Sequence, residues 1–166
     1  MLLDDSLRAA GIVGDLAGPI VDVGSGGGAP GIPLAAALPD REMTLVEAER
    51  RKADFLEQWT TELPNLRVVW GRAEEQENDT FGVALAKALA SPPVAAEWCL
   101  PLVRPGGAVV LWVGPSADLE AVGRVAEQIN GAVLENRGGL VVIRKLGSTP
   151  EGFPRRPGMA RKRPLA

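Results

Sequence analysis

The sequence predicts an α/β domain in which a mostly parallel sheet carries helices on both faces. Three observations support this: a strand, a glycine loop and a helix follow one another between residues 19 and 38, β-branched runs then alternate with amphipathic stretches, and a hairpin signal stands near the C-terminus. A chain of 166 residues, 46% of them hydrophobic, is long enough for one domain with a core in three layers. We expect that domain to cover residues 1–166, with a short helical remnant at 1–18 and a basic C-terminal strap at 145–166.

Strands are expected at short apolar or β-branched runs, at residues 20–23, 43–46, 66–70, 83–86, 108–113, 132–135 and 140–144. Helices are expected where apolar residues recur at helical spacing, at residues 2–13, 32–38, 50–63, 95–102 and 117–129. The turn signal Asn-Arg-Gly-Gly at 136–139 predicts an antiparallel pair at the end of a seven-stranded sheet. Because they fall within helix or strand patterns, four tryptophans are expected in the core: Trp59, Trp70, Trp98 and Trp112.

The composition excludes several kinds of chemistry. The chain has a single cysteine, Cys99, and no histidine, which rules out a disulfide framework, a cysteine zinc site, histidine-ligated metals and nucleophiles activated by histidine. No apolar run approaches the roughly 20 residues that span a bilayer, and the N-terminus lacks the basic region of a signal peptide. We therefore expect a cytoplasmic protein that binds neither a membrane nor a metal. A monomer is a separate expectation, which the composition does not decide.

The glycine loop admits two interpretations. Residues 26–31 fit the dinucleotide pattern G-x-G-x-x-G, and Glu47 stands about where a ribose-binding acid belongs. The loop also has Asp22 in the strand before it and alternating glycines after it, which resembles motif I of the class I S-adenosylmethionine (SAM) methyltransferases. Pro30 and Pro33 favour SAM, because each removes an N–H that a pyrophosphate would need and SAM has no phosphate. A dinucleotide site and a plain glycine turn stay open as alternatives.

Three stretches should meet at one edge of the sheet. The carboxyl ends of parallel strands lie on the same edge, and ligands bind there. Residues 24–28 leave the first strand, Glu47 ends the second and residues 71–75 follow the third. A carboxylate at this place can accept hydrogen bonds from both ribose hydroxyls, so Glu47 is a candidate for holding the ribose of a nucleotide-like cofactor.

Four stretches together resemble one family, the RsmG (GidB) methyltransferases: residues 21–34, 45–56, 71–75 and 154–165. The last of them, P-R-R-P-G-M-A-R-K-R-P-L, is the most distinctive, because such a basic ending is not general to methyltransferases. The resemblance implies the Rossmann-like fold of class I SAM-dependent methyltransferases. It also implies methyl transfer from SAM to N7 of a guanine in 16S ribosomal RNA, guanine 527 in standard numbering, with the rRNA or the small ribosomal subunit as the partner.

The resemblance further implies roles for particular residues. It places the methionine part of SAM in the glycine loop with its amino group near Asp22, the ribose on Glu47 and the adenine beside residues 73–74. The implied cofactor-binding residues are Asp22, Gly24, Ser25, Gly26, Gly28, Glu47, Ala73 and Glu74. Guanine N7 has a free lone pair and carries no proton, so a chain without histidine loses nothing in this reaction.

Two features concern the RNA. Lys87 follows the fourth predicted strand and is the catalytic candidate, as a contact to the target nucleotide or its phosphate; a solvated lysine at a strand end is the alternative. On a chain of net charge −3, basic residues gather in the C-terminal strap, and five are candidates for contact with rRNA phosphates: Arg155, Arg156, Arg161, Lys162 and Arg163. The prolines of this segment also fit a stiff strap packed on the sheet edge.

The chain departs from the family pattern at three places. The helical segment that usually precedes the stretch at residues 5–7 is not in the sequence, Gly82 stands where the family tends to have an acid, and Lys87 stands where arginine is usual. A non-catalytic relative that binds SAM or RNA is therefore the alternative function.

Overall fold

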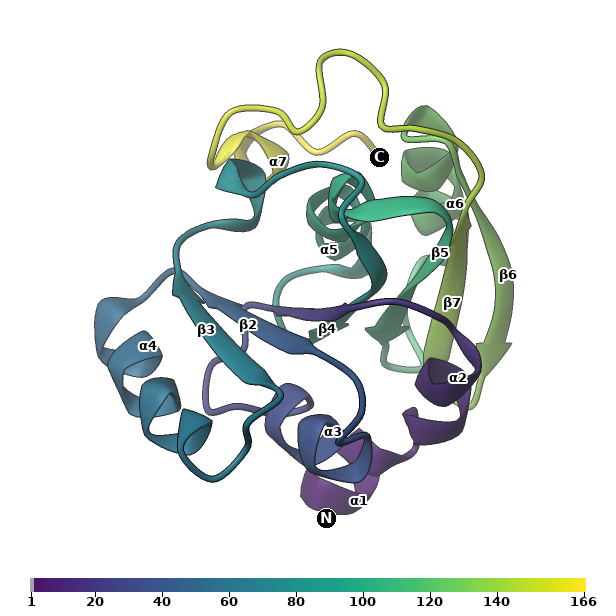
Figure 1. Cartoon of the computed structure of the whole chain (residues 1–166). Coiled ribbons are helices and arrows are strands. Elements are labelled where there is room, and N and C mark those ends of the chain that lie inside the picture. The colour runs from purple at the N-terminus through teal and green to yellow at the C-terminus, as the bar shows by residue number, and fades with distance from the viewer. Residues whose placement is uncertain (1) are drawn as a thin grey trace.

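The computed structural model describes residues 2–166, and its central feature is a seven-stranded sheet in the order β3-β2-β1-β4-β5-β7-β6 (Figure 1). The strands are β1 (Ile20–Val23), β2 (Met43–Glu47), β3 (Leu66–Trp70), β4 (Phe81–Lys87), β5 (Val103–Trp112), β6 (Gly131–Arg137) and β7 (Leu140–Lys145). β1 to β5 are parallel, whereas β7 runs antiparallel to both β5 and β6. The predicted sheet, mostly parallel with an antiparallel C-terminal hairpin, is confirmed.

Helices cover both faces of the sheet, as Figure 1 shows. One face carries α1 (Leu2–Leu7), α2 (Ala10–Asp15), α3 (Gly31–Ala37) and α4 (Arg50–Glu57). The other carries α5 (Pro92–Cys99), α6 (Leu119–Gln128) and α7 (Met159–Lys162). Short 3-10 turns follow α4, β3 and α5: η1 (Gln58–Thr60), η2 (Ala73–Glu75) and η3 (Leu100–Leu102). Each face has its own cluster of buried apolar side chains.

β1 lies at the centre and contributes to both clusters. Ile20 packs in the cluster under α3, and Val21 and Val23 pack in the cluster under α5, because successive side chains of a strand point to opposite faces. A strand buried on both faces calls for apolar residues throughout, and every residue of β1 is buried. Asp22 breaks this pattern, which singles it out as a residue with a specific task.

Some predicted boundaries differ from the observed ones. The helix expected at 2–13 is two helices separated at residues 8–9, and the one expected at 50–63 ends at Glu57 before η1. The hairpin turn consists of Gly138 and Gly139 alone, with φ of 55° and 91°. A two-residue turn of this kind needs positive φ at both positions, which glycine adopts without strain, so residues 136–137 remain in β6.

The prediction that all four tryptophans lie in the hydrophobic core is wrong for two of them. Trp98 on α5 is buried, but Trp70 is 59% exposed and Trp59 is 40% exposed. β3 is an edge strand, and Trp70 is its last residue, where its Nε1 donates to the carbonyl of Ala48, just after β2, at 3.1 Å. The Arg50 guanidinium lies 5.0 Å from the centroid of the same ring. The hydrophobic character of its residues did not show that β3 is an edge strand and not a central one.

The glycine at position 82 has a packing explanation. Gly82 lies near the amino end of β4, and its N–H donates to the Pro19 carbonyl at 2.9 Å. A Cβ at this position would run into the backbone carbonyl of Ala17. The carboxyl end of β4, where Lys87 lies, is at the opposite edge of the sheet, so this departure from the family pattern concerns the packing of residues 17–19.

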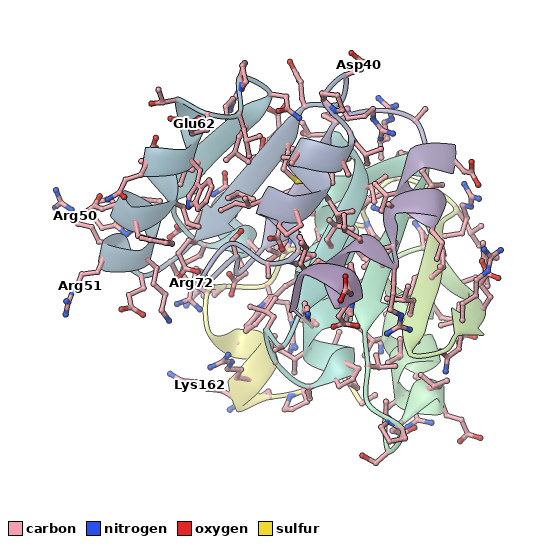
Figure 2. All side chains as sticks on the ribbon, turned by 90° about the horizontal axis from the view of Figure 1, so that it is seen from below. Asp40, Arg50, Arg51, Glu62, Arg72 and Lys162 are labelled. Carbon is pink, nitrogen blue, oxygen red and sulfur yellow. The ribbon has the colours of Figure 1, made fainter. Side chains whose placement is uncertain are left out.

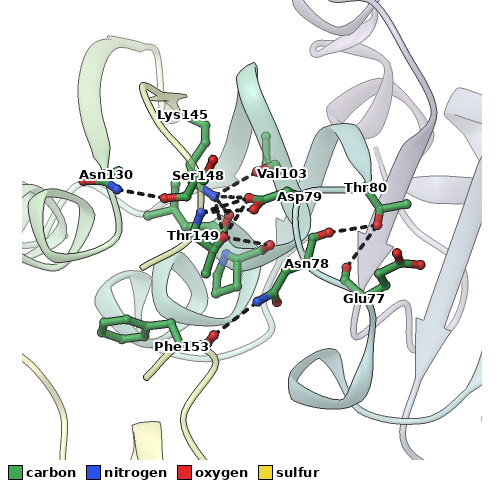
Figure 3. Close-up of polar contacts among 12 residues, drawn as sticks. Glu77, Asn78, Asp79, Thr80, Val103, Asn130, Lys145, Ser148, Thr149 and Phe153 are labelled. Atoms are coloured by element: carbon green, nitrogen blue, oxygen red, sulfur yellow. Dashed lines mark hydrogen bonds and ion pairs between the residues drawn. The ribbon is translucent and has the colours of Figure 1, made fainter. Parts of the chain in front are cut away.

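The C-terminal strap is anchored to the body of the protein where it leaves β7 (Figure 3). Lys145, the last residue of β7, is fully buried, and its ammonium donates to the Asp79 carboxylate at 3.0 Å and to Thr149 Oγ1 at 2.8 Å. The backbone N–H of Thr149 also donates to Asp79. This network ties residues 145–149 to the loop before β4.

Candidate active site

A cavity of about 490 Å³ opens at the carboxyl edge of β1 to β4, the edge at which the sequence predicts a ligand. Its wall is built from the ends of four strands and from three helices: Val23, Gly24, Gly26, Val46, Glu47, Ala48, Glu49, Lys52, Gly71, Arg72, Ala73, Glu74, Ala88, Leu89, Trp98 and Arg161. The three stretches expected at one rim therefore do meet.

The glycine loop forms one side of the cavity. Gly24 and Gly26 are wall residues with φ of 68° and 55°, a conformation that residues with a Cβ rarely adopt. A Cβ on Gly24 would also run into the side chain of Leu89, another wall residue, which lies directly beside it. The missing side chain thus leaves room for Leu89 at the end of β1.

The N–H groups of this loop are largely used inside the protein. Those of Gly24 and Ser25 donate to the Val46 carbonyl at 2.8 and 3.3 Å, which fastens the loop to β2. Gly28 N–H donates to Ser25 O at 2.7 Å, and Gly26 N–H donates to the Glu47 carboxylate at 2.7 Å. A loop whose donors are already engaged offers a poor cradle for phosphate, because phosphate binding depends on free N–H groups.

The start of α3 completes this picture. Gly31 N–H donates to the Asp22 carboxylate at 3.0 Å, Ile32 N–H donates to the Gly28 carbonyl at 2.7 Å, and Pro33 has no N–H. The first turn of this helix is therefore not arranged to hold a pyrophosphate. The dinucleotide interpretation loses its main physical support, while a cofactor without phosphate is unaffected.

Glu47 is the wall residue at the end of β2. Its carboxylate accepts the N–H of Gly26 at 2.7 Å on one oxygen and the N–H of Glu49 at 2.9 Å on the other, and the side chain is nearly buried. These bonds hold the carboxylate rigid between the glycine loop and α4. Each carboxylate oxygen can accept two hydrogen bonds, so both retain capacity for ligand hydroxyls.

Asp22 lies beneath the loop instead of in the cavity wall. Oδ2 accepts the Gly31 N–H, whereas Oδ1 is buried without a hydrogen-bond partner. Burial raises the pKa of this carboxyl to about 7, with the nearby Glu47 charge acting in the same direction. Its expected role near the methionine amino group stays a prediction, and in the structure its direct contact is with the start of α3.

The raised pKa of Asp22 predicts a pH dependence of stability. A carboxyl with a higher pKa in the folded state contributes stability that is present below its unfolded pKa of about 3.9 and is lost as pH rises through about 7. We expect the free energy of unfolding of the protein without cofactor to fall by about 1–3 kcal/mol from this group between pH 4 and pH 8. Urea titrations of the unaltered protein and of Asp22→Asn across this range test it, because the variant should lack that component. Parallel profiles for the two proteins would contradict the prediction.

The other predicted cofactor residues fall into two groups. Ala73 and Glu74, in the 3-10 turn η2 after β3, are in the cavity wall, and Glu74 Oε1 accepts the N–H of Gly158 at 3.2 Å. Ser25 and Gly28 lie behind the wall. Ser25 Oγ donates to the Asp22 carbonyl at 2.9 Å, and Gly28 has φ of 98° where a Cβ would meet Ile32. They shape the loop without facing the cavity.

Lys87 lies at the same edge but outside the cavity wall. Its ammonium pairs with the Asp5 carboxylate of α1 at 2.6 Å, and its side chain is 17% exposed. The carbonyl of Asp5 accepts the indole N–H of Trp112 at 3.1 Å, at the end of the neighbouring strand. α1 therefore holds Lys87 in place beside the ends of β4 and β5.

The five basic residues of the strap do not share one orientation. Arg155 is half-buried, and its guanidinium binds both oxygens of buried Glu97 at 2.6 and 2.7 Å. Arg161 is in the cavity wall. The other three, Arg156, Lys162 and Arg163, are exposed, and Figure 2 shows Lys162 pointing away from the molecule.

Sequence reasoning missed several wall and supporting residues. Leu89 and Trp98 showed no pattern beyond that of a buried strand end and a core helix, yet both line the cavity. Glu97 showed one usable signal, because it is a lone acid in the otherwise apolar helix α5, where it forms the buried partner of Arg155.

The residues present fit SAM. The cavity volume lies in the range of small-molecule sites, and Glu47 offers a fixed carboxylate for ribose hydroxyls. The engaged loop donors suit a ligand without phosphate. Within residues 2–166, no group of three or more acidic or cysteine side chains is arranged to hold a metal ion, and no helix there is both long and apolar enough to cross a membrane.

Comparison with known proteins gives consistent matches. A family model described as "GidB: rRNA small subunit methyltransferase G" matches residues 2–136. Ribosomal RNA small subunit methyltransferase G of Pelotomaculum thermopropionicum is 41% identical over 165 residues, which covers 88% of this chain and 69% of that protein. The protein of the same name from Rubrobacter xylanophilus is 38% identical over 186 residues, which covers 99% of this chain and 69% of that protein.

Solved structures show the same fold at low identity. The antibiotic-resistance methyltransferase Kmr matches with a TM-score of 0.67 at 15% identity, covering 86% of this chain and 92% of that chain. TYW2 of M. jannaschii, in complex with AdoMet, matches with a TM-score of 0.68 at 13% identity, covering 86% and 72% respectively. The predicted class I SAM-dependent methyltransferase fold is thereby confirmed.

Proposed function

Because the chain belongs to the GidB family, rRNA small subunit methyltransferase G, we propose that it transfers a methyl group from SAM to N7 of a guanine in 16S ribosomal RNA, guanine 527 in standard numbering. The observation that carries this proposal is the cavity in which the glycine loop after β1 meets Glu47 at the end of β2. SAM, the cofactor of this family, supplies an electrophilic methyl group on a sulfonium when it is bound.

Different residues of the cavity wall would hold different parts of the cofactor. Of these wall residues, Glu47 would bind the ribose hydroxyls, Gly24 and Gly26 would leave room for the methionine part, and residues 73–74 would lie beside the adenine. Asp22 and Ser25 support the loop from below through their bonds to Gly31 and to each other. The protein's contribution is therefore to fix the reacting groups in line, since orientation alone can supply a large part of a methyl-transfer rate.

The absence of histidine is compatible with this chemistry. N7 of guanine carries no proton and attacks through an in-plane lone pair, so the step needs no general base. The base gains positive charge as the bond forms, and nearby carbonyls or acids at the edge of the sheet would stabilise that charge. The side-chain chemistry available in this chain, carboxylates and cations, matches these needs.

The exposed cations of the strap are the candidates for the RNA surface. Arg156, Lys162 and Arg163 face solvent and can pair with rRNA phosphates, which would give salt-sensitive affinity without sequence choice. Arg155 and Arg161 were predicted for the same role, but their guanidinium groups already have partners in the protein, so an RNA contact would be additional. A monomer acting in the cytoplasm, where ribosomal RNA would be its substrate, stays a prediction.

Lys87 is proposed to contact the target nucleotide or its phosphate. Lys87→Gln should lower the methyl-transfer rate about tenfold, the effect of losing one charge-assisted hydrogen bond, while the dissociation constant for SAM stays unchanged because Lys87 is outside the cavity wall. The matched control is Asp5→Asn, which removes the same ion pair but keeps the cation. Equal losses of rate in the two variants would show that only the ion pair matters, and Lys87 would then be structural.

The proposed function is tested by methyl transfer from labelled SAM to small-subunit RNA, or to particles, that lack the modification. Mapping the label should place it at N7 of one guanine. SAM binding detected by calorimetry with no transfer to either substrate would favour the alternative, a non-catalytic relative. Label at another atom or on another RNA would overturn the proposed specificity.

A further inference from the structure

The C-terminal strap returns to the cavity that the glycine loop forms. The N–H of Gly158, just before α7, donates to Glu74 Oε1 at 3.2 Å, and Glu74 is a wall residue. Ala160, in α7, is buried and packs in the apolar cluster under α5, which fixes the position of this short helix. Figure 1 shows α7 beside α5, although α7 lies at the other end of the sequence from β1. The start of the last helix thus borders the cavity beside the turn after β3.

Arg161 is the residue through which α7 reaches the cavity. Its guanidinium carbon lies 5.2 Å from the centroid of the Trp98 ring, and its Nη2 donates to the carbonyl of Leu89 at 3.1 Å. Trp98 and Leu89 are both wall residues. Two independent contacts therefore hold a planar cation in place at the cavity, although the residue as a whole is solvent-exposed.

The position of Arg161 relative to Glu47 indicates which part of a ligand it would meet. The loop at residues 24–26 forms one end of the wall, and Glu47 lies next to it through the Gly26 hydrogen bond. The turn after β3 forms the wall at the other end, where Ala73 packs in the same apolar cluster as Trp98, the residue against which Arg161 lies. Gly158, three residues before Arg161, is bonded to Glu74 at this end as well. A ligand with its ribose on Glu47 and its amino-acid part along the loop has only its base left for this end.

We propose that Arg161 is a cofactor-binding residue that closes the adenine end of the cavity, and that the C-terminal strap is a wall of the cofactor site. This inference rests on the proposed function, because it assumes that SAM occupies the cavity. A guanidinium held by Trp98 offers N–H donors to the ring nitrogens of adenine and a flat face to its π system. The strap then has two faces, with Arg161 turned to the cofactor and neighbouring Lys162 turned to solvent.

The test compares two neighbours on one helix. Arg161→Gln should weaken SAM binding about fivefold by calorimetry, whereas Lys162→Gln, which removes the same charge from the exposed side of α7, should leave the dissociation constant unchanged. The same fivefold loss should appear with 5′-methylthioadenosine, which keeps the adenine and ribose but lacks the amino-acid part. Arg161→Lys should recover part of the affinity, because it restores the charge without the planar group.

Each outcome bears on a different claim. Equal SAM affinities for Arg161→Gln and Lys162→Gln would overturn the inference while leaving the proposed function intact. A loss with SAM but none with methylthioadenosine would place Arg161 at the amino-acid end and overturn it as well. Thermal unfolding of each variant without cofactor identifies any general loss of structure. If Arg161→Gln is destabilised in this way, the SAM affinity of Arg161→Lys is compared with that of Lys162→Gln instead. Failure of the unaltered protein to bind SAM at all would overturn the proposed function itself, and this inference with it.

Discussion

Replacing Glu47 with glutamine is expected to weaken SAM binding about a hundredfold and to abolish measurable methyl transfer at cofactor concentrations that saturate the unaltered protein. The variant loses the charge that would bind both ribose hydroxyls. It also turns an amide NH₂ toward one of the two backbone N–H groups that the carboxylate now accepts, those of Gly26 and Glu49. Calorimetry with SAM, and with S-adenosylhomocysteine as a second ligand, measures the loss.

The geometry explains why this effect should be large. Glu47 is 7% exposed, so a donor facing another donor there has no water to relieve it, and leaving a buried polar group unsatisfied costs about 1–3 kcal/mol. The Gly26 contact also fixes the glycine loop, so the variant loses ligand contacts and loop geometry together. One side chain thus organises two of the three stretches at the rim.

The matched control is Glu49→Gln, two residues further along the same wall. Glu49 is also a wall residue, but its carboxylate is exposed and pairs with Lys52 at 2.9 Å on the surface. Exposed ion pairs contribute little, so SAM affinity should change less than about threefold. A loss of similar size in both variants would mean that the cavity responds to net charge alone, and the ribose assignment of Glu47 would be wrong.

The sequence was sufficient for the features that depend on local pattern. β1, β2 and β3 were predicted almost to the residue, because short apolar or β-branched runs between turn residues specify short strands. Once these strands are parallel, their carboxyl ends must share an edge, so the meeting of the glycine loop, Glu47 and residues 71–75 followed from topology. Position on the chain alone thus located the part of the cavity wall formed by Gly24, Gly26, Glu47 and residues 71–74.

The remaining features depend on contacts between residues far apart in the sequence. Arg155 was predicted to contact RNA because it belongs to a basic run, and nothing local reveals that buried Glu97 on α5 binds its guanidinium. Arg161 reaches Trp98 and Leu89 only because Ala160 anchors α7 under α5. A run of like charges is divided into inward and outward members by packing, and packing is set by the whole fold.

The glycine loop illustrates a subtler limit. A glycine loop between a strand and a helix commonly presents free backbone N–H groups to a ligand. In the structure the N–H groups of Gly24 and Ser25 instead fasten the loop to the Val46 carbonyl of β2. Composition indicated that the backbone could approach a ligand closely, but the direction of each N–H was determined by the neighbouring strand.

Replacing Asp79 with asparagine is expected to destabilise the protein by about 3–5 kcal/mol. The ammonium of Lys145 is fully buried and pairs with this carboxylate at 3.0 Å, so the variant leaves a buried cation without its counter-charge. Asparagine is the suitable substitute because Asp79 has φ of 54°, a left-handed conformation that asparagine tolerates. Urea titration at pH 7 measures the loss, and Asp118→Asn is the matched control. Asp118 caps α6 through the N–H of Ala121, and asparagine caps helices equally well.

The pH dependence has a definite sign. Burial alone would raise the pKa of Asp79, but hydrogen bonds from Thr149 and Lys145 outweigh it and hold that pKa below the usual value. A carboxyl with a lowered folded pKa contributes stability above its unfolded pKa of about 3.9 and loses it as pH falls toward the folded pKa. The difference in unfolding free energy between the unaltered protein and Asp79→Asn should therefore be full at pH 7 and shrink below about pH 4.

The two partners of this ion pair should not be equivalent. Lys145→Met leaves Asp79 with its hydrogen bonds from Thr149 and with a side chain that is 28% exposed to water, so it should cost less than Asp79→Asn. In the double variant no buried cation remains, and the total loss should be smaller than the sum of the single losses. Additive losses, or an Asp79→Asn variant no less stable than Asp118→Asn, would show that the pair does not stabilise the fold.

The same network fixes the first residues of the strap. Asp79→Asn should therefore also be cleaved faster by proteases after β7. The contacts that anchor the strap are thus the same ones that stabilise the sheet.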